Sequence, residues 1–531
     1  MIRKKMFPPI GILLLLMGAC ANIDPGKGKE RVSLLYIGDI HGQFEEHPEM
    51  FWSKNGGEEQ TVEIAGGAAR IASAVKEIQS QNSDGTVFFD AGDTIQGSAD
   101  VAVSEGEVAI PILNALDFDF AIPGNWEVVY GTKRFKEISK RLKFPFLAAN
   151  IFDTKTEKRV FAPYKIIEKK GLKLAFIGFT DPDVPNRQPP TFSKGFSYKG
   201  AEILQPLIDN LRRKEHVDGV FLVTHIGLPK AVKLAETVKG VDVLFSSDTH
   251  ERTYEPIVKG DTWVVEPGAF GSFLGKLDVY KSESGKLKKS WNLIELKAKD
   301  FQKDRQVLKV VKETLSPLDK KLDKVIGETK VTLARYNVIE TSLDALLADA
   351  LRASTGTDLA FSNGFRFAHP VVPGSIREKD LWNFFPITTP IKTGKLTGKQ
   401  IKNFLEREIE NVFSEDAENL FGGWLPRVSG LKVVFNSSAP AMKRVKEVLV
   451  GGQPLVEHRL YSVTTCVREG DPDTTLCRIP NGRDIEIKEF DAHEAVRKYL
   501  AKNSPIITSP ALNRFIGEDL SGTVRSQYFR K

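Results

Sequence analysis

Five short apolar runs in the N-terminal half of the chain are each followed within a few residues by polar side chains that can bind a metal ion. The runs are Val32–Ile37, Thr86–Phe89, Asp119–Ile122, Val220–Val223 and Val241–Phe245. Runs of this length and composition predict buried β-strands. Because open α/β sheets place ligand sites just past the C-terminal ends of their strands, the pattern predicts one functional site along that edge.

The polar residues that follow the runs carry oxygen and nitrogen donor atoms. They are Asp39, His41, Asp93, Asn125, His225 and His250. Mixed donors of this kind suit Zn, Mn, Fe or similar divalent ions better than calcium. Two such ions about 3.5–4 Å apart would acidify a bound water and clamp both the attacking and the leaving oxygen. The set therefore predicts a centre for two divalent metal ions.

The length of the chain predicts more than one domain. At 531 residues it exceeds what a single hydrophobic core usually organises. Apolar runs alternate with helical patterns across residues 31–298, and the clearest of these patterns predicts a helix over residues 68–81. This alternation predicts a layered α/β domain over residues 31–298.

Residues 299–330 differ in composition and predict a helical linker. They are charged and nearly free of aromatic residues, and Pro317 divides the helix-compatible sequence. Because proline disrupts a helix interior, we expect two helical pieces on either side of Ser316 and Pro317. Residues 331–531 then predict a second α/β or α+β domain, which opens with a helix over Ser342–Ala353.

The charged residues do not indicate a nucleic-acid partner. The net charge of +6 is a small difference between 75 Lys and Arg and 69 Asp and Glu residues. The basic residues are also dispersed along the chain, which is typical of solvated surfaces.

Residues 1–30 predict export. A basic start, Met1–Lys5, precedes an apolar stretch, Ile10–Met17, that is too short to span a bilayer and is typical of a secretion signal. Small residues before Cys20 resemble the lipobox of bacterial lipoproteins, which predicts a membrane-anchored lipoprotein facing the periplasm or cell exterior. The alternative is a simple signal in which Cys20 is incidental. In an oxidising compartment, Cys466 and Cys477 are expected to form a disulfide.

The ordered motifs around the polar residues resemble those of calcineurin-like metallophosphoesterases. They are Asp39-Ile-His41-Gly42, Gly92-Asp93, Gly124-Asn125-Trp126-Glu127, Thr224-His225 and Asp248-Thr-His250. Gly66-Gly67-Ala-Ala-Arg70 is typical of the exported 5′-nucleotidase branch. The resemblance implies a four-layer α/β sandwich followed by a second α/β (α+β) substrate-binding domain.

The resemblance also implies individual roles. Asp39 and His41 would bind one ion, Asp93 would bridge both, and Asn125 and His225 would bind the other. His250 and Asp248 would complete the set, although Asp248 stands where the family usually has histidine. The added carboxylate favours harder ions, so we expect manganese before zinc, magnesium or iron.

A second departure lies at Trp126, where the family usually has a histidine that assists the reaction. Asp93, Asn125, Trp126 and Glu127 are the catalytic candidates, yet an indole has one N–H and cannot transfer a proton near neutral pH. Trp126 with Tyr130 and Gly131 resembles the sulfur-oxidation thiosulfohydrolase. The tryptophan either marks that subgroup or packs over the metal ligands.

In the second domain the resemblance implies a substrate site. Arg366 and Asn363 match a family motif, and the Arg366 guanidinium suits an anionic substrate. Phe385 or Trp424 would stack on a base or lie in the core, and Arg427 is a further candidate anion contact.

We therefore expect a two-metal 5′-nucleotidase that hydrolyses nucleotide phosphoesters through a metal-activated hydroxide. One alternative is a thiosulfohydrolase-like enzyme acting on a carrier-protein thiosulfonate. The other is a non-catalytic surface binding protein on the same scaffold.

Overall fold

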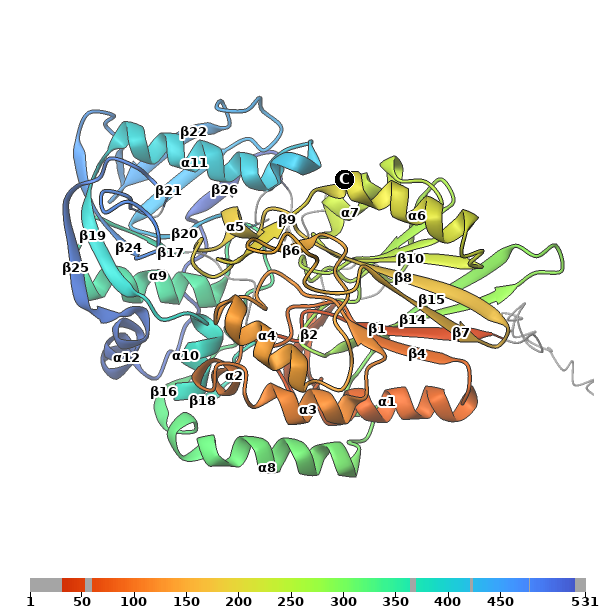
Figure 1. The fold of residues 1–531 in the computed structure, drawn as a ribbon. Helices are drawn as coiled ribbons and strands as arrows, with labels where there is room; N and C mark the ends of the chain where they lie inside the picture. Colours follow the sequence, from red (N-terminus) through yellow and green to blue (C-terminus); the bar gives the residue numbers. More distant parts are fainter. Residues whose placement is uncertain (1–30, 53–59, 363–368, 421–423, 477, 521–531) are drawn as a thin grey trace, which may run out of the picture.

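The computed structural model describes residues 31–52, 60–362, 369–420, 424–476 and 478–520. The N-terminal domain lies on the right of Figure 1 and the C-terminal domain on the left, with helix α8 (Arg305–Leu322) below them. The N-terminal signal, Cys20 and Cys477 lie outside the described residues, and Cys466 is a free cysteine.

Two β-sheets form the centre of the N-terminal domain. In sheet order, the first contains β15 (Leu287–Glu295), β14 (Phe273–Lys281), β1 (Val32–Ile37), β4 (Thr86–Asp90) and β5 (Phe120–Ala121). The second contains β12 (Ile257–Lys259), β13 (Thr262–Val265), β11 (Val243–Phe245), β10 (Gly219–His225), β8 (Leu172–Thr180) and β7 (Tyr164–Lys169). Strands β1, β4 and β5 are parallel, as are β8, β10, β11 and β13.

Helices cover the outer face of each sheet. Aromatic side chains such as Phe89, Phe176 and Phe245 fill the space between the sheets. Helices α1 (Ala68–Gln81), α3 (Ala109–Leu116) and α8 pack on the first sheet, and α6 (Leu204–Arg213) and α7 (Leu228–Thr237) on the second. Strands buried on both faces are continuously apolar, which explains the sequence runs. The predicted four-layer α/β architecture is confirmed.

The linker does not consist of two helical pieces, as the sequence predicted. Helix α8 continues through Pro317, whose side chain is exposed to solvent. The buried positions Val307, Val311, Leu315 and Leu322 lie on both sides of the proline and face the core. Packing of this apolar stripe holds the helix together although the proline removes one hydrogen bond. The predicted linker also contains a strand, β16 (Val325–Thr329), which pairs with β18 (Gly374–Arg377).

The C-terminal domain is a mixed α/β unit. Its five-stranded sheet contains, in order, β20 (Arg427–Ser429), β17 (Leu359–Ser362), β24 (Leu460–Cys466), β19 (Pro390–Thr397) and β25 (Arg483–Asp491). A smaller sheet contains β23 (Gln453–Pro454), β22 (Val445–Val450), β21 (Leu431–Phe435) and β26 (Phe515–Gly517). The helices are α9 (Ser342–Thr355), α10 (Glu378–Phe384), α11 (Gly398–Phe413) and α12 (Ala492–Asn503).

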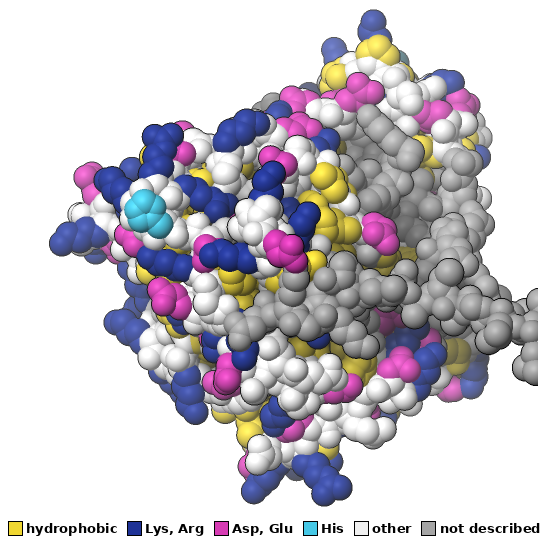
Figure 2. All heavy atoms as spheres, turned by 90° about the vertical axis from the view of Figure 1, so that its right-hand side faces the viewer, with side chains coloured by type: hydrophobic (Ala, Val, Ile, Leu, Met, Phe, Trp, Pro, Cys, Tyr) yellow, Lys and Arg dark blue, Asp and Glu magenta, His cyan; other side chains and the backbone are white. Residues whose placement is uncertain are grey.

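The surface agrees with the dispersed charge of the sequence. Figure 2 shows Lys and Arg side chains interspersed with Asp and Glu over the described part of one face, not gathered into a stripe. Within the described ranges, no helix is both long and apolar enough to cross a membrane.

Candidate metal centre

The predicted ligands converge where the strands of both sheets end. Asp39 and His41 follow β1, Asp93 follows β4, and Asn125 follows β5. The sequence predicts that His225 lies just past its strand, but His225 is the last residue of β10 itself. Asp248 and His250 follow β11. The two sheets thus bring residues from five strands to one place.

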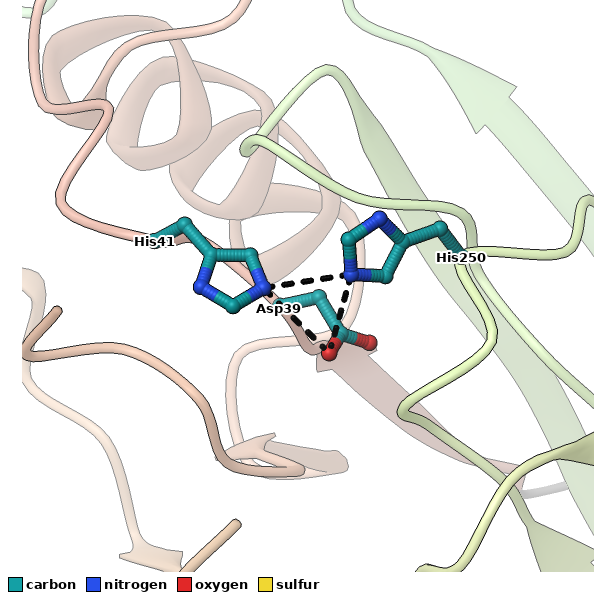
Figure 3. Close-up of side chains that lie close together, drawn as sticks. All are labelled: Asp39, His41 and His250. Carbon is teal, nitrogen blue, oxygen red and sulfur yellow. Dashed lines mark hydrogen bonds and ion pairs between the residues drawn. The ribbon is translucent and has the colours of Figure 1, made fainter. Parts of the chain in front are cut away.

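One group of ligands contains Asp39, His41 and His250 (Figure 3). The Nε2 atoms of the two histidines lie 3.1 Å apart. Asp39 Oδ1 lies 3.8 Å from Nε2 of His41 and 3.5 Å from Nε2 of His250. These three atoms are close enough together to bind the same cation.

A second group contains Asp39, Asp93 and His225. His225 Nε2 lies 3.1 Å from Asp93 Oδ2 and 3.8 Å from Asp39 Oδ1. Asn125 Oδ1 and Asp248 Oδ1 lie 3.2 and 3.8 Å from the same nitrogen. Asp39 belongs to both groups, and Asp93 Oδ2 is also within 3.9 Å of His41 Nε2. Both carboxylates therefore lie between the two groups.

Two buried oxygens indicate that the centre fits cations. Asp39 Oδ1 is buried and has no hydrogen-bond partner among the described residues. Asn125 directs its amide oxygen toward Asp93 Oδ2 at 3.0 Å and Asp248 Oδ1 at 3.2 Å, so three acceptors face one another. Without an ion, the amide would be expected to turn its nitrogen inward; with a divalent ion, the oxygen is correctly placed to bind it.

The histidine pKa values also fit a cation site. Burial, reinforced by the neighbouring His250, holds the pKa of His41 well below its ordinary value, so the ring is neutral and can bind a metal. Burial also disfavours a charged His225, but the adjacent Asp93 outweighs it and raises the pKa of His225. A metal ion in place of that proton would neutralise the same carboxylates.

Five of the candidate ligands have left-handed backbone conformations. They are Asp39 (φ 52°), His41 (φ 50°), Asp93 (φ 57°), Asp248 (φ 94°) and His250 (φ 58°). Non-glycine residues rarely adopt such angles, and strain of this kind is concentrated at functional sites.

Backbone carbonyls orient two of the imidazoles. His41 Nδ1 lies 3.0 Å from the carbonyl oxygen of Gln96, and His225 Nδ1 lies 2.8 Å from that of Ala91. Each carbonyl accepts the Nδ1 proton and so leaves Nε2 as the ligand atom.

Glu127 holds the loops that carry Asp93 and Asn125 through hydrogen bonds to their backbone. It is 1% exposed and accepts hydrogen bonds from the backbone N–H groups of Gly124 (2.6 Å), Asp93 (3.0 Å) and Thr94 (2.8 Å). Burial, together with the charge of Asp93, raises the pKa of Glu127 to about 7. These contacts indicate that Glu127 positions the loops of the candidate ligands Asp93 and Asn125.

Glu266, which the sequence did not single out, has the same function in the loop after β11. It accepts hydrogen bonds from Thr249 Oγ1 (2.7 Å), Glu251 N (2.8 Å) and Ser246 Oγ (2.7 Å). Glu266 follows strand β13 directly, so the rule that found the other strand-end residues also applies to it.

Trp126 follows Asn125 in the chain and contacts the metal centre through its backbone. Its backbone N–H donates to Asp93 Oδ1 at 2.8 Å. Its half-buried ring packs with Tyr336 of the C-terminal domain against Ala269 and Phe270. The Phe270 ring in turn contacts the imidazole rings of His41 and His250.

Of the substrate candidates in the C-terminal domain, the structure describes Phe385, Trp424 and Arg427. Arg366 and Asn363 lie outside the described residues. Phe385 is 2% exposed and belongs to the core, so it offers no free face to a base in this conformation.

Arg427 is also buried and does not face a site. Its guanidinium donates to the carbonyls of Ile339 (2.8 Å) and Asn337 (3.1 Å), and Nε lies 3.1 Å from Asp344. The Trp424 ring lies 5.2 Å from the Arg427 guanidinium carbon. In this conformation the Arg427 guanidinium is thus engaged by two backbone carbonyls and by Asp344.

Arg187 is a further site residue that sequence reasoning missed. Its guanidinium donates to Asp248 Oδ1 and to Asp181 Oδ2, both at 2.7 Å. Asp181 directly follows strand β8, so its position was the available signal.

Comparisons with known proteins match both domains. Residues 32–252 match the calcineurin-like phosphoesterase family, and residues 325–466 match the 5′-nucleotidase C-terminal domain. The trifunctional nucleotide phosphoesterase protein YfkN of Bacillus subtilis is 26% identical over 497 residues, which are 82% of this chain. The chain spans only 33% of the length of that relative.

Two solved structures from Thermus thermophilus share the fold of the whole chain. The sulfate thiohydrolase SoxB superposes with a TM-score of 0.81 at 24% identity, covering 93% of this chain and 98% of SoxB. A 5′-nucleotidase precursor gives 0.80 at 22% identity, covering 92% and 100%. The protein is a metal-dependent phosphoester hydrolase. More specifically, it belongs to the calcineurin-like phosphoesterases that carry a 5′-nucleotidase C-terminal domain.

Proposed function

We propose that this protein hydrolyses nucleotide phosphoesters at a centre of two divalent metal ions. The observation that supports it is the pair of buried ligand groups that share Asp39 at the strand ends. Their carboxylate and imidazole donors, with the amide of Asn125 beside His225, would suit two divalent ions, which catalyse in-line displacement at phosphorus in two-metal sites.

When bound, the ions would supply Lewis acidity to the phosphoryl group and to the attacking water. The protein's own residues hold and orient that chemistry. Asp39 and Asp93 lie between the two ligand groups, and Glu127 fixes the loops that carry Asp93 and Asn125. The Trp126 ring packs against Ala269 and Phe270, and its indole cannot transfer a proton near neutral pH. We propose that Arg366 and Asn363 contact the substrate from the C-terminal domain.

The absence of a proton donor at Trp126 has a consequence for the substrate. A leaving group that is stable as an anion, such as a phosphate, needs no proton, whereas a nucleoside alkoxide does. We therefore expect nucleoside diphosphates and nucleotide sugars to be hydrolysed faster than AMP.

The experiment is chromatographic analysis of the hydrolysis products formed by the purified protein lacking its first 20 residues, because UDP-glucose and cyclic nucleotides are cleaved without release of inorganic phosphate. Metal content is measured first, and AMP, ADP, UDP-glucose and a cyclic nucleotide are then compared with Mn²⁺, Mg²⁺ or Zn²⁺. Turnover that requires a divalent ion and is lost with EDTA supports the proposal. Protein that binds two ions per chain and hydrolyses none of these compounds would refute nucleotide hydrolysis.

A second candidate is a thiosulfohydrolase that releases sulfate from a carrier-protein thiosulfonate. Trp126 with Tyr130 and Gly131 favours it, and the overall fold is equally compatible with it. Sulfate release from a cysteine S-thiosulfonate peptide, with no phosphate release from nucleotides, would select this candidate.

We also propose that the protein is exported and anchored by a lipid on Cys20. The basic and apolar segments of residues 1–17 support this proposal. Expression in Escherichia coli with radiolabelled palmitate should label the native chain but not Cys20→Ser. Equal labelling of both would refute the anchor.

A further inference from the structure

The segment after β8 contacts the metal centre through two neighbouring side chains. Arg187 lies at the end of α5 (Val184–Arg187) and donates to Asp248 Oδ1 at 2.7 Å. The next residue, Gln188, is 3% exposed, and its Nε2 lies 3.2 Å from the side-chain amide of Asn125. Asp248 and Asn125 both belong to the His225 side of the centre.

Gln188 can support Asn125 in the orientation that binds a metal. When Asn125 directs its oxygen inward, its amide nitrogen faces Gln188. Gln188 Oε1 is buried and has no hydrogen-bond partner in the described part of the chain. A half-turn of the Gln188 amide lets this oxygen accept from Asn125, which satisfies both groups at once.

Arg187 offsets the charge that Asp248 adds to the centre. Asp248 is a third carboxylate beside Asp39 and Asp93, where the related motif usually has a neutral histidine. The Arg187 guanidinium is 15% exposed and pairs with both Asp248 and Asp181, so it is fixed from two sides. Because Asp181 fixes the guanidinium, its other nitrogen holds Asp248 Oδ1 in place.

The C-terminal domain donates hydrogen bonds to the backbone of the same segment. Arg468, in the loop after β24, donates through Nη2 to the carbonyl of Asn186 at 3.1 Å and to that of Gln188 at 2.7 Å. Its Nη1 donates to Asp471 at 2.8 Å, which fixes the guanidinium. These carbonyls flank Arg187, so one C-terminal side chain holds the turn that carries both contacts to the metal centre.

We propose that Arg468 is a positioning residue that acts through the 186–188 turn. It places Arg187 on Asp248 and Gln188 on Asn125, and thereby couples docking of the C-terminal domain to binding of the ion on the His225 side. This inference deepens the proposed two-ion function and rests on it. On this inference, the affinity for the ion on the His225 side depends on the position of the C-terminal domain.

The test is Mn²⁺ titration of the metal-free protein by isothermal titration calorimetry. The native chain should bind two ions. Arg468→Ala should weaken one of them by about tenfold or more, as is typical when a partner of a metal ligand is lost, and leave the other unchanged. Arg478→Ala is the matched control, because Arg478 pairs with Glu408 within the C-terminal domain.

A double-mutant cycle distinguishes positioning from general destabilisation. In the Arg187→Gln, Gln188→Ala background, Arg468→Ala should produce no further loss of Mn²⁺ affinity. Arg468→Met keeps an unbranched side chain but has no N–H donor for the two carbonyls, so it should resemble Arg468→Ala. Circular dichroism and the thermal midpoint verify that each variant is folded.

The outcomes separate this inference from the proposed function. Native protein that binds fewer than two Mn²⁺ ions would overturn both. Two ions in the native protein with unchanged affinities in folded Arg468→Ala or Arg468→Met would overturn the inference alone. An equal loss at both ions, or an undiminished effect of Arg468→Ala in the double-variant background, would also overturn it.

Discussion

Asp93 is the carboxylate with contacts to most parts of the metal centre. Its Oδ2 faces His41 and His225, and its Oδ1 accepts from the Trp126 backbone. We predict that Asp93→Ala loses at least one bound metal ion and reduces kcat/KM by at least about a hundredfold, more than loss of an outer partner costs.

Metal content by mass spectrometry and phosphate release measure this effect. Asp153→Ala is the control, because Asp153 is a partly exposed partner of Lys136 far along the chain from the ligands. Full metal content and unchanged turnover in Asp93→Ala would exclude the two-ion mechanism.

We expect Trp126 to determine which leaving groups the centre tolerates. We predict that Trp126→His, which installs a proton donor, raises the rate on AMP by about tenfold or more, the lower end of what general acid catalysis supplies. Trp126→Phe keeps an aromatic ring and should not raise it. Initial rates from pH 5 to 9 should show a falling limb at high pH for Trp126→His alone. A rate on AMP that is equal in both variants would contradict the prediction.

At the scale of the element, helix α8 contains an unfavourable residue on its exposed face. Proline in a helix interior costs about 3 kcal/mol relative to alanine. We predict that Pro317→Ala increases the free energy of unfolding by about 1–3 kcal/mol, because the apolar stripe already holds the helix straight enough to regain the hydrogen bond. Denaturant unfolding measures the change, and Lys312→Ala on the exposed side is the control. A decrease in the free energy of unfolding of Pro317→Ala would contradict this prediction.

Local patterns explain how much of the fold and site could be predicted. The helix Ala68–Gln81 has the predicted bounds, because helical spacing and the glycines before it are both local signals. The helix from Ser342 extends to Thr355, two residues past its predicted end. The candidate ligands could be predicted because each of them lies at or just past the C-terminal end of a buried strand, where α/β sheets place their ligand sites.

Contacts between distant segments could not be predicted in the same way. Arg187 meets Asp248 across 61 residues, and Arg468 meets Gln188 across 280. Such pairs leave no periodic trace in one sequence. Pro317 was misjudged for a related reason, since the packing of α8 on α1 and α3 overrides a local signal.

At the scale of the whole molecule, the two domains enclose a cavity of about 190 Å³. Asp100, on α2 (Ala99–Val103), lines it together with Glu45 and with Lys379 of the C-terminal domain. Burial, followed by the charge of Glu45, raises the pKa of Asp100 from 3.8 to about 6. Because the folded state binds this proton more tightly than the unfolded chain, the Asp100 carboxylate destabilises the fold above pH 6, and the penalty disappears as the pH falls toward 4.

We predict that Asp100→Asn increases the free energy of unfolding by roughly 1 kcal/mol at pH 7.5, after allowing for solvent around a half-buried group. The advantage over the native chain should shrink through pH 6 and vanish near pH 4. Thermal midpoints measured across this range test it, with Asp84→Asn, at an exposed turn, as the control. An advantage that is constant with pH would contradict the titration of Asp100.

The left-handed ligand residues are held by backbone hydrogen bonds that involve no ion. The N–H groups of Asp39 and His41 donate to the carbonyls of Gly92 (2.8 Å) and Asp93 (2.9 Å), and Phe270 N donates to the carbonyl of Asp39 (2.8 Å). Because these bonds join the ligand loops without a metal taking part, we expect the loops to keep their shape when the ions are removed, unlike small zinc domains that fold only around their ion. We then expect the centre to release and rebind ions without unfolding, so that the metals available around the protein decide which ions occupy it.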